Sequence, residues 1–357
     1  MPWDLLIDRA DLAHTELVEG PVPESGPGQA VLRVDRVGLT SNNITYAVFG
    51  DAMRYWDFFP TDPRDGVTYG RVPLWGFSVV QQSEVPELEV GTRLFGYVPT
   101  SSHLLIEPTH IGPKGLRDAA PHRQHLPAVY NSFTMTAGDL AYRPELEDLQ
   151  ALYRPLFLTS FVLADFITDN GCFGGDTVVL SSASSKTAYG TAFLLDDVRT
   201  VGLTSAGNRE FVEGLGCYDQ VVTYDDIAAM PEHRAVFVDV AGDGGIRRAV
   251  HERLAPVHSA IVGASHHDAP PDADAGAELP GAPPTFFFAP DQIRKRTEEW
   301  GPDGVDGRYA EAWARFAPVV SGWVDVEVGD GPAALEADWQ ATLAGSVSPS
   351  TGLVISF

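Results

Sequence analysis

Cysteine is nearly absent from this sequence. Of its 357 residues only Cys172 and Cys217 are cysteines, and neither belongs to a Cys-x-x-Cys pair. Two isolated thiols exclude a disulfide framework and a thiolate-rich zinc site. The only adjacent histidines stand in the run His266-His267-Asp268, which precedes a stretch rich in Pro, Ala and Asp. This run is either a set of metal ligands or part of a flexible loop. The composition favours the loop, so we predict no metal site.

Positive charge is also scarce. Lysine occurs only as Lys114, Lys186 and Lys295, and the formal net charge is −25. This excess repels nucleic acid and anionic membranes, so we expect neither as a partner. A local basic pocket for a phosphate is still compatible with this charge, which makes Lys186 notable.

Long apolar runs are missing as well. No run approaches the roughly 18 to 20 apolar residues that span a bilayer. The first residues, Met-Pro-Trp-Asp, lack the basic and apolar regions of a signal peptide. We therefore expect a cytoplasmic protein.

The two halves of the chain differ in rhythm. Residues 1–115 contain short alternating runs such as Val31–Val37 and Thr92–Val98, punctuated by Gly and Pro, which predicts a β-rich module. From about residue 151, short β-branched runs alternate with helical segments; Asp176–Leu180 is the first such run. This alternation predicts βαβ units and a doubly wound parallel sheet, the Rossmann arrangement.

The turn after the first of these strands is where a doubly wound sheet binds phosphate, because free N–H groups at the start of the next helix favour an anion. Every residue of this turn except Lys186 is small, and the turn has no glycine; Gly190 comes one helical turn later. Two interpretations stay open: a serine N-cap of a packed helix, or a phosphate site built from hydroxyls and one ammonium group. The candidate ligands in this turn are Ser182, Ser184, Ser185, Lys186 and Thr187.

The end of the second strand of this half bears on the choice of cofactor. An NAD site wants an acidic residue there, and none occurs before Glu210. The residues present suit a 2′-phosphate instead, which favours NADPH; a plain loop with a solvated arginine is the alternative. The candidates are Thr204, Ser205, Asn208 and Arg209, and Tyr224 after the third strand is a further pocket residue.

Several segments follow one another in an order typical of one superfamily. They are Val37-Gly-Leu-Thr-Ser-Asn-Asn43, Val90-Gly-Thr-Arg-Leu-Phe-Gly96, Leu180 to Gly190, Leu215-Gly-Cys-Tyr-Asp-Gln-Val-Val222, Phe237-Val-Asp-Val-Ala-Gly242, Ile261-Val-Gly263 and Gly352-Leu-Val-Ile355. In these segments the chain resembles the medium-chain dehydrogenase/reductase superfamily, especially its zinc-free, quinone-oxidoreductase-like members. It departs from them where serines replace the glycines of the phosphate loop and where the catalytic-zinc positions are not filled.

The resemblance implies an α/β fold with a GroES-like β-rich catalytic domain beside the Rossmann domain. It places residues 1–145 and 291–357 in the catalytic domain and 146–290 in the dinucleotide-binding domain. It also implies a homodimer and puts Gly242 at the cofactor site.

The resemblance further places Asn42, Asn43 and Tyr46 on the acceptor side of the active site. Tyr46 is our candidate proton donor or carbonyl polariser, and a buried structural tyrosine is the alternative. The aromatic run Tyr55–Phe59 is either an apolar wall for the acceptor or ordinary packing. Tyr97, His125, Tyr130 and Asn131 are weaker candidates, and the basic run 294–296 is either a phosphate contact or a helix surface.

Three functions remain open. The first is an NADPH-dependent, zinc-independent reductase of an α,β-unsaturated carbonyl or quinone-type small molecule. The second is a non-redox lyase-type enzyme on the same scaffold. The third is a binding or regulatory protein that lost catalysis together with the loop glycines.

Overall fold

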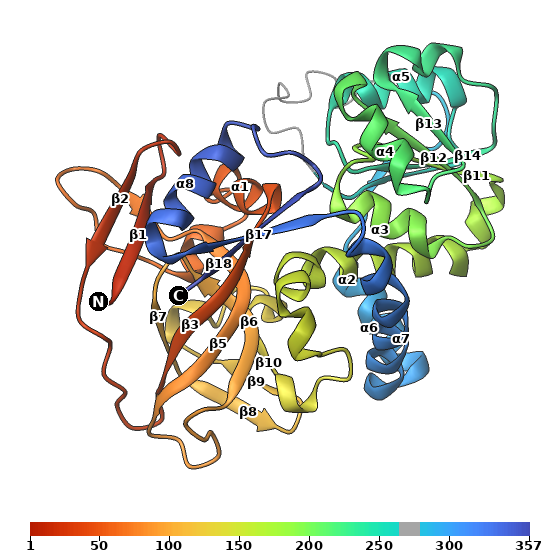
Figure 1. Ribbon diagram of the computed structural model, residues 1–357. Coiled ribbons are helices and arrows are strands. Elements are labelled where there is room, and N and C mark those ends of the chain that lie inside the picture. Colours follow the sequence, from red (N-terminus) through yellow and green to blue (C-terminus); the bar gives the residue numbers. More distant parts are fainter. Residues whose placement is uncertain (264–278) are drawn as a thin grey trace. The chain divides into compact units, whose positions relative to one another are not determined.

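The structure is a computed structural model that describes residues 1–263 and 279–357 (Figure 1). The run His266-His267-Asp268 lies outside the described residues. The chain forms two compact units: unit 1 contains Met1–Leu152 and Val324–Phe357, and unit 2 contains Tyr153–Trp323. Each unit has its own sheet and its own buried apolar residues.

The main sheet of unit 1 has nine strands. Eight follow the order β17-β18-β3-β5-β6-β10-β9-β8, and β7 pairs with β3. Their bounds are β3 Ala30–Leu39, β5 Pro73–Ser83, β6 Arg93–Pro99, β7 His103–Ile106, β8 Pro108–Gly112, β9 Gly115–Asp118, β10 Ser132–Met135, β17 Asp325–Asp330 and β18 Thr351–Ser356. The C-terminal strand β18 runs antiparallel to β3, with Leu353 opposite Leu39, so the end of the chain completes the sheet that the N-terminal residues begin (Figure 1).

A smaller sheet and two helices cover this sheet. The small sheet has the order β2-β1-β4, with β1 Trp3–Asp8, β2 Thr15–Glu19 and β4 Tyr69–Gly70. The helices are α1 Ser41–Val48 and α8 Gly331–Leu343. Trp339 of α8 is buried and donates its indole N–H to the carbonyl of Leu12 (2.8 Å), which fixes this helix against the β1–β2 hairpin.

The sheet of unit 2 has six parallel strands in the order β13-β12-β11-β14-β15-β16. Their bounds are β11 Thr177–Leu180, β12 Arg199–Thr204, β13 Gln220–Thr223, β14 Ala235–Asp239, β15 His258–Ile261 and β16 Pro284–Phe286. The first strand, β11, lies in the middle, and the strand order reverses between β11 and β14. This is a doubly wound sheet, whose ligands bind at the carboxyl ends of the strands near the reversal. The predicted fold class is confirmed.

Six α-helices accompany this sheet: α2 Glu147–Asp169, α3 Lys186–Leu194, α4 Arg209–Leu215, α5 Gly244–Leu254, α6 Ala289–Trp300 and α7 Pro302–Val320. The remaining short helices are 3₁₀ turns: η1 Tyr55–Phe58, η2 Pro121–Arg123, η3 Ala128–Asn131, η4 Thr136–Gly138, η5 Pro144–Leu146, η6 Gly171–Gly174, η7 Ala206–Asn208 and η8 Tyr224–Ala229. Strands β11 and β14 are buried along their whole length, as expected when helices cover both faces of a parallel sheet.

The boundaries of the compact units differ from the predicted domain boundaries at 146 and 291. Helices α6 and α7 lie in unit 2, because Phe316 stacks on Phe157 of α2 (4.4 Å between ring centres) and Arg296 pairs with Asp165 (2.7 Å). The basic run 294–296 is therefore a surface of α6: Lys295 pairs with Asp169 of α2, and Arg294 with an acid of its own helix.

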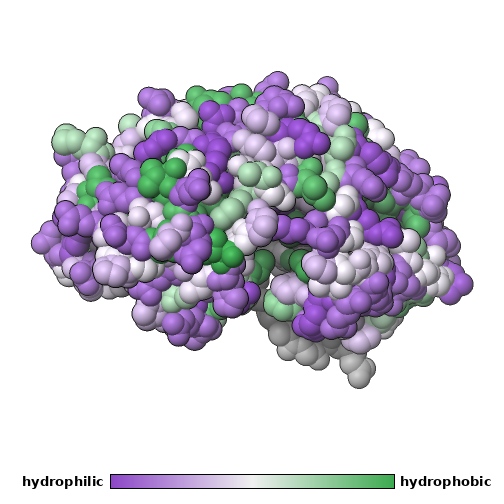
Figure 2. Space-filling view, turned by 90° about the horizontal axis from the view of Figure 1, so that it is seen from below, coloured by the Kyte–Doolittle hydropathy of each residue, from purple (hydrophilic) through white to green (hydrophobic). Residues whose placement is uncertain are grey.

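Helix α2 is more apolar than the sequence analysis allowed. Within the part of the chain that the structure describes, the stretch Pro144–Asp169 is long and apolar enough to cross a membrane by length and composition. In unit 2, however, Phe157, Leu163 and Ile167 of this helix are fully buried among residues of the sheet and of α7. Packing inside a folded unit thus accounts for its apolar side chains. One face of the molecule, seen in Figure 2, is mostly hydrophilic with small separate hydrophobic groups.

Candidate functional site

The turn after β11 is fastened to β14 by Ser181, which the sequence analysis left out of its candidates. The fully buried Ser181 hydroxyl donates to Asp239 Oδ1 (3.0 Å) and accepts the N–H groups of Val240 (2.9 Å) and Ala241 (3.0 Å). Asp239 also pairs with Arg247 (2.8 Å). These contacts fix the carboxyl ends of the two strands on either side of the reversal.

The next residues of the turn are held by hydrogen bonds to Tyr224 and to β12. Ser182 has φ 51°, in the left-handed region, and its N–H donates to the Tyr224 hydroxyl (3.0 Å). Ala183 donates its N–H to the carbonyl of Leu203 in β12 (2.9 Å). This approach requires glycine at position 202, because a Cβ there would lie 2.9 Å from the Ala183 Cβ. Tyr224, which was predicted as a pocket residue, thus contacts the backbone of the turn through its hydroxyl group.

Helix α3 begins directly after this turn. Ser185 is its N-cap, and its hydroxyl accepts the N–H of Ala188 (3.3 Å). The N–H groups of Ser184, Lys186 and Thr187 have no hydrogen-bond partner among the residues that the structure describes. The serine cap and the free donors are therefore both present, and the free donors form the kind of helix start that binds anions.

Lys186 is the first residue of α3. Its Nζ is 5.7 Å from the centre of the Tyr153 ring, and no described carboxylate lies within ion-pair distance of it. Tyr153, a residue that the sequence analysis missed, is itself held by a 2.5 Å hydrogen bond between its hydroxyl and that of Tyr189. Burial lowers the pKa of Lys186 to about 8. A desolvated ammonium group without a counter-charge suits an anionic ligand.

The end of β12 comes close to the same turn. Asn208 donates its amide to the Ser184 hydroxyl (3.2 Å), so residues predicted on two different loops do meet. Thr204 is buried at the end of the strand, and Ser205 is exposed. Arg209 pairs instead with Glu213 of its own helix (2.8 Å), with both side chains about half exposed. Arg209 must leave this pair to reach a phosphate.

Two further contacts position the start of α3 and the end of β14. Ser160 of α2 donates its hydroxyl to the Thr187 carbonyl (2.8 Å), and a Cβ at Gly190 would lie 2.7 Å from the Ser160 hydroxyl. Gly190 therefore serves helix packing. Gly242 has φ 72° and donates its N–H to Asp239 Oδ1 (2.9 Å), which makes the tight turn after β14.

In unit 1, Asn43 belongs to the capping box at the start of α1, whose N-cap is Thr40. Its side-chain carbonyl accepts the Thr40 N–H (2.8 Å) and hydroxyl (3.2 Å), and its amide donates to the Pro73 carbonyl (2.9 Å). Only 2% of the residue is exposed. These contacts occupy the side-chain carbonyl fully and direct the amide to the backbone. Asn42 and Tyr46 lie one helical turn apart on α1, with Asn42 half-buried.

The Tyr46 side chain is 5% exposed, and its hydroxyl accepts the Trp75 indole N–H (3.1 Å). Burial raises the pKa of Tyr46 well above its usual value, which hydrogen bonds from Trp75 and Asn42 oppose. Since indole only donates, the Tyr46 proton is left for another acceptor. The group is thus a protonated hydrogen-bond donor at neutral pH.

Tyr46 belongs to an aromatic group that we call the tyrosine cluster: Tyr46, Tyr55, Trp75, Tyr97 and Tyr130. Their ring centres lie 4.6 to 6.4 Å apart in most pairs. The Tyr97 hydroxyl is buried without a hydrogen-bond partner among the described residues. Of the weaker candidates, Tyr97 and Tyr130 thus join Tyr46, whereas Asn131 holds the buried Arg123 (2.9 Å) and His125 contacts Arg54. Trp75 was missed, because a tryptophan inside a strand carries no sign of its partner.

Two pockets in the described part of the chain contain neither the predicted cofactor-binding residues nor Asn42, Asn43 and Tyr46. One lies in unit 1 beside Phe58 and Phe59. The other lies in unit 2 near Arg199 and Asp219, at the amino ends of strands β12 and β13, opposite the carboxyl ends where doubly wound sheets bind ligands. We therefore place the candidate site on the backbone donors and on Lys186 rather than on the larger hollows.

Comparisons with known proteins agree with this fold. The family model described as "Protein of unknown function (DUF2855)" matches residues 37–348. No curated protein matches the sequence. Among solved structures, CurA from Vibrio vulnificus in complex with NADPH has a TM-score of 0.60 at 13% identity, covering 99% of this chain and 98% of that one.

Two other solved structures are similar over their whole length. The yhdH oxidoreductase from Salmonella enterica in complex with NADP has a TM-score of 0.56 at 14% identity, covering 99% of both chains. The quinone oxidoreductase from Coxiella burnetii has a TM-score of 0.56 at 13% identity, covering 100% of this chain and 99% of that one. These matches, at 13 to 14% identity, show the fold alone, and it is the fold that the resemblance implied.

Proposed function

The chain belongs to the family "Protein of unknown function (DUF2855)", and we propose that it is an NADPH-dependent, zinc-independent reductase of an α,β-unsaturated carbonyl or quinone-type small molecule. The observation that carries this proposal is the start of α3, where the N–H groups of Ser184, Lys186 and Thr187 and the Lys186 ammonium group have no described partner. Support also comes from similar folds solved with NADPH and NADP.

The residues of unit 2 fit a dinucleotide as follows. The free N–H groups and Lys186 would bind the pyrophosphate, and the Ser182 and Ser185 hydroxyls flank it. Thr204, Ser205 and Asn208, with Arg209 once released from Glu213, would bind the 2′-phosphate, since no acid occupies this loop. Tyr224 and Gly242 would shape the walls. Bound NADPH supplies a hydride.

The residues of unit 1 supply the acceptor side of the proposal. The Tyr46 hydroxyl would donate a hydrogen bond to the acceptor carbonyl, with Trp75 and Asn42 orienting it. Asn43 would position α1 through its cap. Zinc independence is part of the same proposal, because the catalytic-zinc positions of the resembled superfamily are not filled in this sequence.

The homodimer belongs to this proposal too. Strand β16 is an edge strand of the parallel sheet; Phe286, its last residue, is 65% exposed, and Phe288, just before α6, is 50% exposed. An exposed apolar edge is a surface that a second strand can cover, so we propose that two copies pair there. The expected cytoplasmic location and the absence of membrane and nucleic-acid partners stay predictions.

Nucleotide titration tests the proposal. We expect NADPH to quench or shift tryptophan fluorescence with a tighter Kd than NADH. Lys186→Met should weaken NADPH binding about 10- to 100-fold, because a charge-assisted contact to phosphate is lost. Lys114→Met, which removes an exposed lysine of unit 1, is the matched control and should leave the Kd unchanged.

The outcomes separate the competing functions. If the wild-type chain binds neither nucleotide, the reductase proposal is wrong. If NADPH binds but no enone, enal or quinone is reduced, the non-redox alternative replaces it.

A further inference from the structure

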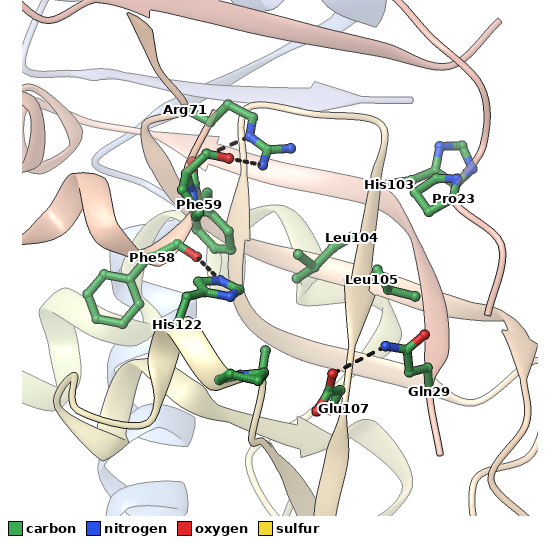
Figure 3. Close-up of a pocket in the computed structure, with 13 residues that line it drawn as sticks. Pro23, Gln29, Phe58, Phe59, Arg71, His103, Leu104, Leu105, Glu107 and His122 are labelled. Atoms are coloured by element: carbon green, nitrogen blue, oxygen red, sulfur yellow. Dashed lines mark hydrogen bonds between the residues drawn. The ribbon is translucent and has the colours of Figure 1, made fainter. Parts of the chain in front are cut away.

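A pocket of about 390 Å³ lies wholly within unit 1 (Figure 3). Its middle is apolar: Phe58, Phe59, Leu104 and Leu105 line it. A positive side chain, Arg71, and a negative one, Glu107, also line it, and Figure 3 draws them on opposite sides of these apolar groups. Apolar walls with a few placed polar groups are typical of small-molecule sites.

Arg71 is held in place but lacks a close counter-charge. Its Nε and Nη2 donate to the carbonyls of Phe59 (3.4 Å) and Pro60 (2.6 Å), which fixes the guanidinium plane. Its nearest carboxylate is Asp4, at 3.6 Å from Nη1 and with a side chain 41% exposed. This distance is longer than the 2.7 to 2.9 Å, roughly, of a charge-assisted hydrogen bond. The remaining N–H groups can still bind a carboxylate.

Glu107 lacks a partner of opposite charge among the described residues. Its Oε1 accepts the amide of Gln29 (3.2 Å), a neutral donor, and no cation among the described residues pairs with it. The side chain is half-buried beside the pocket. A half-buried carboxylate with only a neutral partner is suited to an ammonium group from a ligand.

The apolar middle is rigid. Phe58 and Phe59 are almost fully buried, at 0% and 1% exposed, and pack against Tyr97, with ring centres 5.3 and 6.0 Å apart. The carbonyl of Phe58 accepts a hydrogen bond from His122 (3.2 Å), which closes one side of the pocket (Figure 3). A chain of methylene groups would gain contact with the partly exposed side chains of Leu104 and Leu105.

We propose that this pocket binds a small zwitterion whose carboxylate pairs with Arg71, whose ammonium group pairs with Glu107, and whose apolar middle lies on Leu104 and Leu105. Neither charge of the ligand would then be buried alone, and Glu107 would gain a partner of opposite charge. The ligand class is an amino acid with its two charges separated by an apolar segment. This site is independent of the proposed reductase function.

Three linear probes of similar length test the assignment by calorimetry on the full chain without nucleotide: 6-aminohexanoate, hexanoate and hexylamine. We expect one molecule of 6-aminohexanoate per chain, bound at least about tenfold more tightly than either singly charged probe. Arg71→Met and Glu107→Gln should each weaken it by about tenfold or more. Arg117→Met and Glu87→Gln, exposed residues of the same unit, are the matched controls and should change nothing.

Glu107→Gln keeps the hydrogen bond to Gln29 possible, so it tests the site even if Arg71→Met fails to fold. In this variant 6-aminohexanoate should bind no better than hexanoate. The proposal is overturned if no probe binds the wild type at tens of millimolar, if all three bind equally, or if Glu107→Gln leaves the preference unchanged. Because no nucleotide is present, these results do not depend on whether the chain binds NADPH.

Discussion

The turn before α3 and the tyrosine cluster differ in what their polar groups still lack. At the turn, the N–H groups of Ser184 and Thr187 and the Lys186 ammonium group have no described partner. In the cluster, by contrast, the Tyr46 hydroxyl already accepts a hydrogen bond from Trp75, and the Asn43 side chain is tied to the backbone. The turn thus offers unpaired hydrogen-bond donors to a ligand, whereas the tyrosine cluster offers the proton of the buried Tyr46 hydroxyl group.

The largest effect is expected from removing the Ser181 hydroxyl group, which joins the turn to the end of β14. Ser181→Ala removes a hydroxyl that serves two N–H groups and the Asp239 carboxylate inside the protein. Leaving these groups unsatisfied should cost about 2 to 4 kcal/mol in the free energy of unfolding, measured with urea. Ser184→Ala is the matched control: its partly exposed hydroxyl should cost less than about 1 kcal/mol while still weakening NADPH binding. Equal losses of unfolding free energy in the two variants would contradict this structural role of Ser181.

A second prediction concerns the tyrosine cluster. Tyr46→Phe should lower kcat for acceptor reduction about 100-fold with NADPH binding unchanged, because only the carbonyl contact is lost. Its unfolding free energy should fall by about 1 kcal/mol, since the Trp75 indole loses its acceptor. Tyr97→Phe removes a hydroxyl without a described partner and should leave stability within about 0.5 kcal/mol of wild type. A full kcat in Tyr46→Phe would remove this residue from the mechanism.

Raising the pH should weaken NADPH binding and should stabilise the nucleotide-free chain. Burial lowers the pKa of Lys186 to about 8, so the free protein loses this charge as the pH rises above about 8. NADPH affinity should therefore fall between pH 8 and 10, by up to about tenfold per pH unit. The stability of the nucleotide-free chain should gain a contribution over the same range, since the unfolded chain holds the proton more tightly there.

Fluorescence titration and urea unfolding across this pH range measure both trends. Lys186→Met is the control and should abolish both of them. A wild-type affinity that is flat from pH 7 to 10 would show that Lys186 does not contact the phosphate.

The smallest effect is expected from relieving strain in the turn. Ser182 adopts φ 51°, a conformation that costs a non-glycine residue about 1 kcal/mol. Ser182→Gly should therefore raise the unfolding free energy by no more than about 1 kcal/mol, because the greater freedom of glycine in the unfolded chain offsets part of the gain. A clear loss of stability, measured by thermal unfolding, would mean that the Ser182 side chain is needed.

Much of the fold could be predicted because it depends on local patterns. The buried run at 176–180 and the small residues after it predicted β11, the turn and α3, and the tail strand at 353–357 appears as β18. Helix α1 was not predicted, although Thr40 and Asn43 have the spacing of a capping box. The reason is that residues 37–43 were matched to the end of a strand in the resembled superfamily. The place of α6 and α7 could not be predicted, since Phe316 and Phe157 carry no sequence sign of their contact.

By itself the sequence determined the doubly wound sheet, the glycine-free turn at its centre and the single lysine in that turn. These features follow from the order of apolar, small and charged residues along the chain, and backbone N–H groups at a helix start are free whatever the side chains. Only the tertiary structure decided that the Ser181 hydroxyl joins the turn to Asp239 and that Tyr46 is surrounded by aromatic rings. The physical reason is that these side chains meet partners distant in sequence, and burial and pairing depend on what packs around them.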